Sequence, residues 1–481
     1  MKKNSLTTAV VAGIAGVAGF AGLASAVELN PDGLGQVLIY PYYTVNKSQD
    51  SLFSVVNTTA VGKAVKVRFL EGYNSREVLD FNLYLSPQDV WTARVSQLSD
   101  DGGAAVFTND NSCTYPSIDP DGEPFRAEAY AGGSIFDPDD GPTSITRTRE
   151  GYLELIEMGE IIPGSPLDNA TVHDQNGTPN EGVPTCSPGA IGNGAGIYLT
   201  APGGGLFGAG MIANVGEGTL FSYNADAVDG FSSSVLFSGS AGLTPSLAQA
   251  NTATSAAGGA TAYVFHNGSL LTLDYALGID AVSAVFTAEA LYNEYLVGAG
   301  LGANTDWVVT FPTKRFYVDT QYVPAVVPPF SELFHAPGAS FVEVGIALYD
   351  QEEGFTTQPD DFSPPISTRP SSLPYEVNVI SFLTDTAAGD PSGVFGSFLR
   401  ANIRPYGDAG WLRLDLASGD GGHALRPADN NGVVLNGLPA TGFEAFNVIN
   451  ANAQPGQLAN YNGLFRHRAS RSCTGQDPAC S

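Results

Sequence analysis

The chain has 481 residues and a formal net charge of −28, with 21 basic against 49 acidic side chains. A negative field of this size disfavours binding to nucleic acid and to anionic lipid surfaces. Hydrophobic residues make up 43% of the chain, which suffices for a globular core and excludes wholesale disorder. The 57 glycines and the 10% of aromatic residues are typical of many short strands joined by turns.

Residues 1–26 have the pattern of a signal peptide. Lys2 and Lys3 precede an apolar run, and Ala24-Ser25-Ala26 matches an A-x-A cleavage site. A retained membrane anchor is the alternative. Because no later stretch is long and apolar enough to span a bilayer, we expect a mature chain without a transmembrane segment. We place it at the cell surface or outside the cell, with the periplasm as the alternative.

Residues 35–45 are rich in β-formers and aromatic side chains and predict the first strand, either in the chain's own sheet or donated to a neighbour. Two later runs, 64–70 and 79–85, alternate apolar with polar residues, as half-buried strands do. Pairing that places Phe69 opposite Leu79 also places Arg68 opposite Asp80, a cation against an anion. We therefore predict an antiparallel hairpin, turning at residues 71–75.

Residues 100–189 contain several acidic, glycine-rich turns, and we interpret this block as a long insertion between strands of one sandwich. Within it, alternation over residues 146–162 favours a strand over a helix. An even number of cysteines in an exported chain predicts disulfides. Proximity favours Cys473–Cys480, which leaves Cys113–Cys186 to pin the insertion. A zinc site is the alternative, but the spacings fit no zinc pattern.

The second half of the chain continues the β pattern. Residues 232–259 are small and polar and predict an interdomain boundary or a long loop. Three- and four-residue spacing predicts a helix over residues 281–297. Further strands are predicted at 307–311, 315–318, 340–349, 375–382, 394–403, 411–416 and 443–450. Arg466, His467, Arg468 and Arg471 form a basic tail, interpreted as solvated, with docking on an acidic patch of this or another copy as the alternative.

Together these patterns predict an all-β protein of two antiparallel β-sandwich domains, immunoglobulin-like or jelly-roll-like. Long loop insertions and one or two short helices complete this fold. The first domain spans residues 27–240 and contains the disulfide-pinned insertion 100–189. The second spans residues 241–481 and ends in the basic tail that the second disulfide closes.

Two acidic turns offer the carboxylate and carbonyl oxygens that calcium prefers. The candidate ligands are Asp119, Asp121 and Glu123 in one turn and Asp137, Asp139 and Asp140 in the other. Neither turn follows the order of an EF-hand loop, and solvated acidic turns are the alternative. Calcium is the one cofactor that the sequence suggests.

The motifs of several enzyme classes are missing from the sequence. It contains no nucleophile elbow, no H-E-x-x-H and no P-loop lysine, and its five histidines are scattered singly. Glycoside hydrolysis needs two carboxyl groups across a groove. Glu154, Glu157 and Glu160 are the densest acids near aromatic residues, yet strand spacing places Glu154 and Glu157 on opposite faces. We therefore predict a protein without catalytic activity, with an unrecognised hydrolase as a remote alternative.

Four runs carry a resemblance to a known family. They are VKVRFLEGYNSREVLDFNLYLSPQDVWTA, GGLFGAGMIANVGEGTLFSYNADAVDGF, DWVVTFPTKRFYVD and NANAQPGQLANYNGLFRHR. The chain resembles a family of exported Gram-negative bacterial proteins described as cell surface or hypothetical proteins. The resemblance implies a location outside the cytoplasm and brings no activity and no functional residues.

The function expected from these observations is that of a secreted cell-surface or matrix protein acting through self-association or adhesion. Calcium in the acidic loops would stiffen such a protein. The alternative is a calcium-dependent module that binds extracellular polysaccharide. In that case Trp91, Trp307 or Trp411 would stack on sugar rings, whereas the other interpretation of each tryptophan is a core position.

Overall fold

The computed structural model describes residues 26–99, 102–133, 136–173, 182–240, 242–252, 259–298, 300–357, 371–382, 390–419, 422–427, 432–450 and 453–480. The predicted signal peptide lies outside these residues, apart from Ala26. The described chain is mostly β and forms several antiparallel sheets, which confirms the predicted all-β class at this level. None of the helices among the described residues has the length and apolar character needed to cross a membrane.

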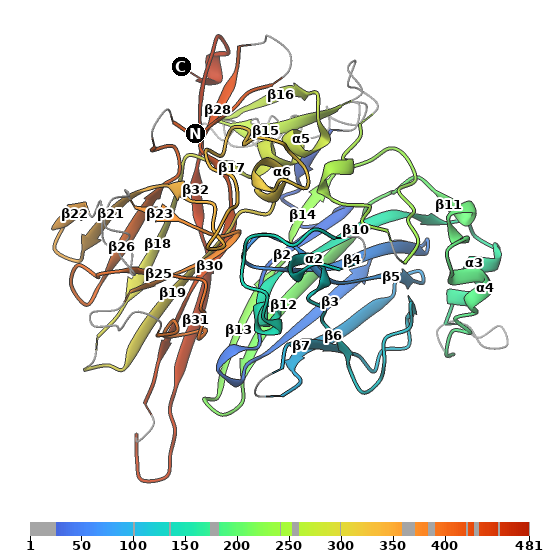
Figure 1. Ribbon diagram of the computed structural model, residues 1–481, viewed down its shortest axis with the longest axis horizontal. Helices are drawn as coiled ribbons and strands as arrows, with labels where there is room; N and C mark the ends of the chain where they lie inside the picture. Colours follow the sequence, from blue (N-terminus) through green and yellow to red (C-terminus); the bar gives the residue numbers. More distant parts are fainter. Residues whose placement is uncertain are drawn as a thin grey trace, which may run out of the picture.

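The N-terminal half forms two large sheets (Figure 1). The eight-stranded sheet has the order β1 (Glu28–Leu29), β14 (Asp226–Asp229), β2 (Val37–Thr44), β10 (Glu150–Ile161), β4 (Lys63–Glu71), β5 (Glu77–Leu85) and β8 (Cys113–Tyr115), and β11 (Leu199–Thr200) pairs with β10. The six-stranded sheet has the order β13 (Thr219–Asn224), β12 (Leu206–Asn214), β3 (Asp50–Asn57), β6 (Val90–Gln97), β7 (Ala104–Phe107) and β9 (Glu123–Pro124).

Aromatic side chains join the inner faces of these two sheets. Phe53 of the six-stranded sheet contacts Tyr40 and Phe69 of the eight-stranded sheet edge-on, with ring centroids 5.5 and 6.1 Å apart. Phe81 and Trp91 repeat this arrangement at 5.8 Å. Edge-to-face rings fill the space between two sheets closely, so these pairs form the centre of the N-terminal core.

The predicted hairpin register is confirmed, because Phe69 lies opposite Leu79 and Arg68 opposite Asp80 in the β4–β5 pair. The interpretation of residues 100–189 as an insertion is wrong. β10 lies in this segment, and it pairs with β2 on one side and with β4 on the other, in the middle of the eight-stranded sheet. The strand predicted within residues 146–162 is confirmed as β10, but the acidic turns that flank it along the chain concealed its central position in the sheet.

The C-terminal half contains two five-stranded sheets. The outer sheet has the order β22 (Phe355–Thr357), β21 (Gly345–Asp350), β26 (Ala409–Asp415), β18 (Ala290–Leu296) and β32 (Arg468–Ser470). The inner sheet has the order β25 (Arg400–Ile403), β24 (Val377–Phe382), β19 (Ala303–Thr310), β30 (Thr441–Val448) and β31 (Tyr461–Arg466), with β24 and β25 parallel. In Figure 1 the inner sheet lies between the outer sheet and the N-terminal sheets.

Shorter elements complete the fold. The small sheets contain β15 (Ala260–His266) with β16 (Ser269–Tyr275), β17 (Thr287–Ala288) with β29 (Leu438–Pro439), β20 (Val342–Glu343) with β23 (Ser372–Leu373), and β27 (Ala424–Leu425) with β28 (Val434–Asn436) and β33 (Ser472–Thr474). The α-helices are α2 (Glu128–Ala131), α3 (Pro166–Thr171), α4 (Pro188–Ile191), α5 (Gly278–Phe286) and α6 (Arg315–Val318).

Two predicted elements are wrong. The helix predicted over residues 281–297 stops at Phe286, and the rest becomes β17 and β18, because a short apolar run fits a strand period as well as a helical one. Residues Ala290–Leu296 form a strand because they pair with β26 on one side and with β32 on the other. The strand predicted at residues 315–318 is the single helical turn α6, which directs the Arg315 guanidinium toward Ser75 of the N-terminal half, whose carbonyl oxygen it reaches at 2.8 Å.

Both predicted disulfides are present, Cys113–Cys186 and Cys473–Cys480. Two disulfides are typical of an oxidising compartment outside the cytoplasm. The expectation of a solvated basic tail is wrong, since the tail forms strands and docks on its own chain. Arg466 forms an ion pair with Asp226, and the Arg471 Nη2 donates to the carbonyl oxygen of Val285 at 2.8 Å.

Candidate functional site

Buried ion pairs lie on the face of the eight-stranded sheet that points away from the core. We call this cluster the polar layer; it comprises Lys66, Arg68, Glu77, Asp80 and Glu154. On the other face of the sheet, Lys63 pairs with Glu157 at 2.9 Å and with Glu160 at 2.8 Å. Arg68 contacts Glu77 at 2.6 Å and Glu154 at 3.3 Å, and Arg315 also contacts Glu154, at 3.4 Å. The carboxylates of the acid-rich segment 154–160 are therefore neutralised within the protein and form no catalytic groove.

A second group of buried charges occupies the turn between β4 and β5. The Arg147 guanidinium lies between Glu71 and Asp139, with Nε 2.7 Å from Glu71 Oε2 and Nη2 2.6 Å from Asp139 Oδ2. Asn74 of the turn donates to Asp139 and to Asp319 of the C-terminal half. Asp139, a predicted calcium ligand, is thus a partner of Arg147 in the structure.

The other predicted calcium ligands do not converge on one point. Asp119 Oδ1 accepts the backbone N–H of Asp121 at 2.9 Å, and Glu123 pairs with Arg126 at 3.1 Å. The side chains of Asp137 and Asp140 are exposed. Within the described ranges, no three His, Cys, Asp or Glu side chains are grouped in a way that would hold a metal ion.

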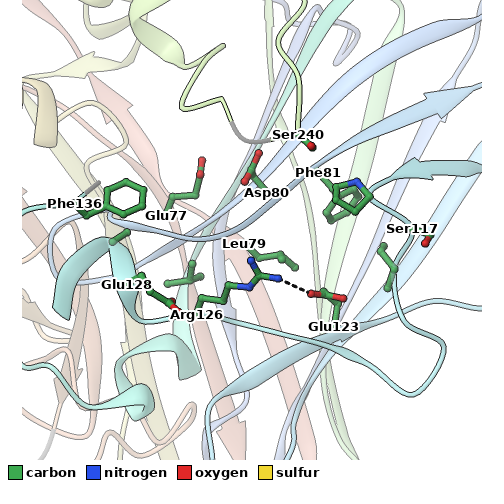
Figure 2. A pocket seen from close by; sticks show the side chains of 14 residues that line it. Glu77, Leu79, Asp80, Phe81, Ser117, Glu123, Arg126, Glu128, Phe136 and Ser240 are labelled. Atoms are coloured by element: carbon green, nitrogen blue, oxygen red, sulfur yellow. Dashed lines mark hydrogen bonds and ion pairs between the residues drawn. The ribbon is translucent and has the colours of Figure 1, made fainter. Parts of the chain in front are cut away.

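A cleft of about 360 Å³ lies over the edge of the polar layer (Figure 2). Its carboxyl groups belong to Glu77, Asp80, Glu123 and Glu128, and Arg126 reaches across it to Glu123. Glu77 and Asp80 are three residues apart, and a register shift in the β4–β5 pair beside Glu77 lets both carboxyls face the cations of β4.

Two of these carboxyl groups have buried cations behind them. Glu77 pairs with Arg68 and Asp80 with Lys66. Burial and the neighbouring charge of Glu77 together raise the pKa of Asp80 to about 6, against the opposing effect of Lys66. The floor of this cleft is therefore the outer edge of a structural ion-pair network. The carboxylates of Glu77 and Asp80 are already paired with Arg68 and Lys66.

The three tryptophans have different environments. Trp91 and Trp307 are 1% and 0% exposed, so the predicted stacking on sugar rings is wrong for both, and they are core residues. Trp411 is 38% exposed on the outer five-stranded sheet. Its indole stacks on Tyr349 of β21, with centroids 4.0 Å apart and planes 5° apart. Of the three, Trp411 alone remains a candidate for sugar binding.

Trp411 borders a cavity of about 500 Å³ at the edge where the two five-stranded sheets meet. We call it the aromatic groove. Its lining contains Trp411, Tyr295, Phe446 and Phe465, the acids Glu294, Asp350 and Glu444, and the amide side chain of Gln351. Glu294 lies directly opposite Trp411 in the β18–β26 pair, on the flank of the indole that Tyr349 leaves uncovered.

Glu444 is the unusual member of this lining. It is 2% exposed and lies on β30 between Trp307 and Phe465 of the neighbouring strands. Its Oε2 accepts no hydrogen bond from any described residue. Burial raises the pKa of Glu444 to about 8, with a further contribution from the charge of Glu294.

Sequence analysis missed both Glu294 and Glu444. Glu294 lay inside the segment predicted to be helical, which hid its position opposite Trp411. Glu444 lies in the mostly apolar strand Thr441–Val448. A single acid in such a strand is unusual because burying a charge is costly, and this was the signal that could have identified it.

The histidines provide no catalytic base in these regions. His467, the corner residue between β31 and β32, is buried, and its Nε2 lies 3.0 Å from the carbonyl oxygen of Val308. Burial lowers the pKa of His467 to about 3, so its ring is neutral at physiological pH. We interpret it as a structural residue.

The aromatic groove thus combines exposed rings with Glu444, whose Oε2 has no hydrogen-bond donor among the described residues. Comparison of the chain with protein-family models, with curated proteins and with solved structures finds no match.

Proposed function

We propose that this protein binds a neutral polysaccharide outside the cytoplasm and that the aromatic groove is the binding site. The observation that carries the proposal is Trp411, a partly exposed indole held in place by Tyr349 at 4.0 Å. The faces of a pyranose ring present C–H groups, and such faces pack on aromatic rings. A ring fixed before binding loses little conformational entropy when a sugar packs on it.

The remaining lining supports the same ligand. Phe465 is 56% exposed and stacks on Phe446, with planes 12° apart, so a second aromatic wall faces the solvent. Glu294, Asp350 and Gln351 provide oxygen acceptors for sugar hydroxyl groups. A cavity of about 500 Å³ lies within the usual size range of ligand sites.

Charge favours a neutral glycan over an anionic one. The described residues that line the groove include three acids and no lysine, arginine or histidine. The whole chain carries a net charge of −28, which repels uronate-rich or sulfated polymers at long range. The ligand that fits is a polymer of uncharged hexoses or pentoses.

We also infer that each half of the chain is an antiparallel β-sandwich, the scaffold that holds the groove. Aromatic contacts between paired sheets support this, Tyr40–Phe53 in the first half and Tyr295–Phe382 in the second. Export to the cell surface is supported by the signal-peptide pattern of residues 1–26 together with the disulfides. Self-association or adhesion stays a prediction from sequence, and light scattering of the mature chain tests it.

Affinity electrophoresis of the mature chain in gels that contain neutral glucans, galactans or mannans tests the proposal. We expect retardation by at least one neutral polymer and none by alginate. Trp411→Ala should lose about tenfold or more in affinity, as buried aromatic contacts at binding sites do. The control is Phe265→Ala, since Phe265 is 66% exposed on β15, outside the groove. Unchanged retardation of Trp411→Ala, or retardation by alginate alone, would overturn the proposal.

A further inference from the structure

Glu444 differs from the other buried carboxyl groups of its own sheet. Asp306 on the adjacent strand β19 is also buried, and it accepts the backbone N–H groups of Val394 and Phe395 at 3.1 and 2.9 Å and the Ser381 hydroxyl. Glu444 has aromatic neighbours instead, and its Oε2 lacks a donor among the described residues. A buried polar atom without a hydrogen-bond partner costs folding free energy, which makes Glu444 a candidate for a functional role.

Glu294 is a second carboxyl group that lines the same groove. Glu294 projects from β18 on the exposed face of the outer sheet, and its charge is felt at Glu444 across the groove. The two acids have opposite environments, one buried among rings and one in contact with solvent. Burial favours the protonated form of Glu444, the form that a proton donor needs, whereas Glu294 is open to solvent.

We propose that Glu444 and Glu294 hydrolyse a glycosidic bond of the polysaccharide held in the aromatic groove, an inference that rests on the proposed function. The Glu444 carboxyl donates its proton to the glycosidic oxygen as the bond from that oxygen to the anomeric carbon breaks. A water molecule adds its oxygen to the anomeric carbon, and its proton passes to Glu294. The sum is the addition of one water to the chain, with no oxidant or reductant.

Both carboxyl groups line the same cavity. Glu444 lies directly opposite Phe465 in the β30–β31 pair, so a sugar that packs on Phe465 lies beside this carboxyl group. Glu294 lies opposite Trp411 on the solvent side, where water reaches it. Burial raises the pKa of Glu444 to about 8, so the proton is present at neutral pH.

The test measures release of reducing ends by the mature full-length chain, using the neutral polymer that retards it most in affinity electrophoresis. Glu444→Gln keeps the shape of the side chain, and we expect about a 100-fold or larger loss of release, the usual contribution of a general acid. Glu294→Gln should show a loss of the same order. Glu444→Gln should keep its affinity for the polymer within about threefold. The control is Glu352→Gln, an exposed acid outside the groove.

The pH profile provides a readout that a structural role would not change. We expect release by the unmodified chain to fall above pH 8, where Glu444 loses its proton. Retardation without release between pH 5 and 9 would overturn the hydrolysis and leave the binding proposal intact. Release that survives Glu444→Gln would also overturn it. Absence of retardation by all neutral polymers would remove both proposals together.

Discussion

The polar layer of the N-terminal half and the aromatic groove of the C-terminal half both contain buried carboxyl groups. The two regions differ in whether a cation lies beside each carboxyl group. In the polar layer each carboxylate faces a cation, as Glu154 faces Arg68 and Arg315. In the groove Glu444 faces aromatic rings and a second acid, Glu294. Buried ion pairs hold strands and domains in one arrangement. A buried carboxyl group without a cation costs stability and is a candidate functional group.

The largest effect is expected in the N-terminal half, where Arg147 lies between Glu71 and Asp139. Arg147→Ala leaves two carboxylates buried without a cation, and the free energy of unfolding should fall by about 3–5 kcal/mol. Urea denaturation measures it. Arg126→Ala is the control, because this side chain is 65% exposed, and its pair with Glu123 should contribute less than about 1 kcal/mol. Equal losses of unfolding free energy in the two variants would contradict the distinction between buried and exposed ion pairs.

In the groove, removing a buried charge should raise the free energy of unfolding instead of lowering it. Because the pKa of Glu444 is raised from 4.5 to about 8 in the folded state, the native protein keeps a proton that the unfolded chain releases. The free energy of unfolding therefore falls as the pH rises through this window, by about 1.4 kcal/mol per pH unit for this group alone. Glu444→Gln removes that slope, so the variant should be more stable than the parent by about 4–5 kcal/mol at pH 8–9 and equal to it near pH 4.5.

Urea denaturation at several pH values measures the difference between the two proteins. Glu294 and Asp350, the other acids of the groove, are present in both and contribute to both curves. The matched variant in the polar layer is Glu154→Gln, which leaves Arg68 and Arg315 with less negative charge and should lose stability. A Glu444→Gln variant that loses stability at pH 9 would show that Glu444 is structural.

The third comparison concerns the tryptophans. Trp307 is fully buried between the two five-stranded sheets, and Trp307→Ala should cost about 3–5 kcal/mol. Trp411 is partly exposed, with Tyr349 stacked on it at 4.0 Å and Tyr292 tilted against it at 6.4 Å, so Trp411→Ala should cost about 1 kcal/mol while removing polysaccharide binding. Thermal denaturation and affinity electrophoresis on the same samples measure the two effects. A loss of stability in Trp411→Ala as large as that in Trp307→Ala would place Trp411 in the core.

Much of the fold is predictable from the sequence because strand alternation is local. The β4–β5 register follows from which residues are apolar, and it holds residue by residue from Phe69–Leu79 outward. The position of β10 is not predictable in this way, because it depends on pairing with β2 and β4, segments about 80 to 120 residues away along the chain. Likewise, β18 takes its strand form from pairing with β26 and β32.

The groove was less accessible to sequence analysis, for a related reason. Trp411 was among the candidates, but the difference between it and Trp307 is one of burial, which depends on how sheets stack. Glu294 and Glu444 come from strands about 150 residues apart, and the lone carboxyl of Glu444 becomes noticeable only when its surroundings are known. The acidic turns were predicted to bind calcium because they contain many carboxylates. The number of carboxylates does not show whether an arginine or lysine already lies beside them.

The smallest effect is expected for calcium. Binding would take 6–8 oxygen ligands, whereas Asp139 is held by Arg147, Asp119 caps its own turn and Glu123 pairs with Arg126. A calcium ion at Asp139 would have to displace a buried guanidinium, which costs several kcal/mol. We therefore expect the thermal midpoint in millimolar calcium and in chelator to agree within about 2 °C. A rise of several degrees with calcium would show that the ion stabilises the native state, and Asp139→Asn would then tell whether this turn holds it.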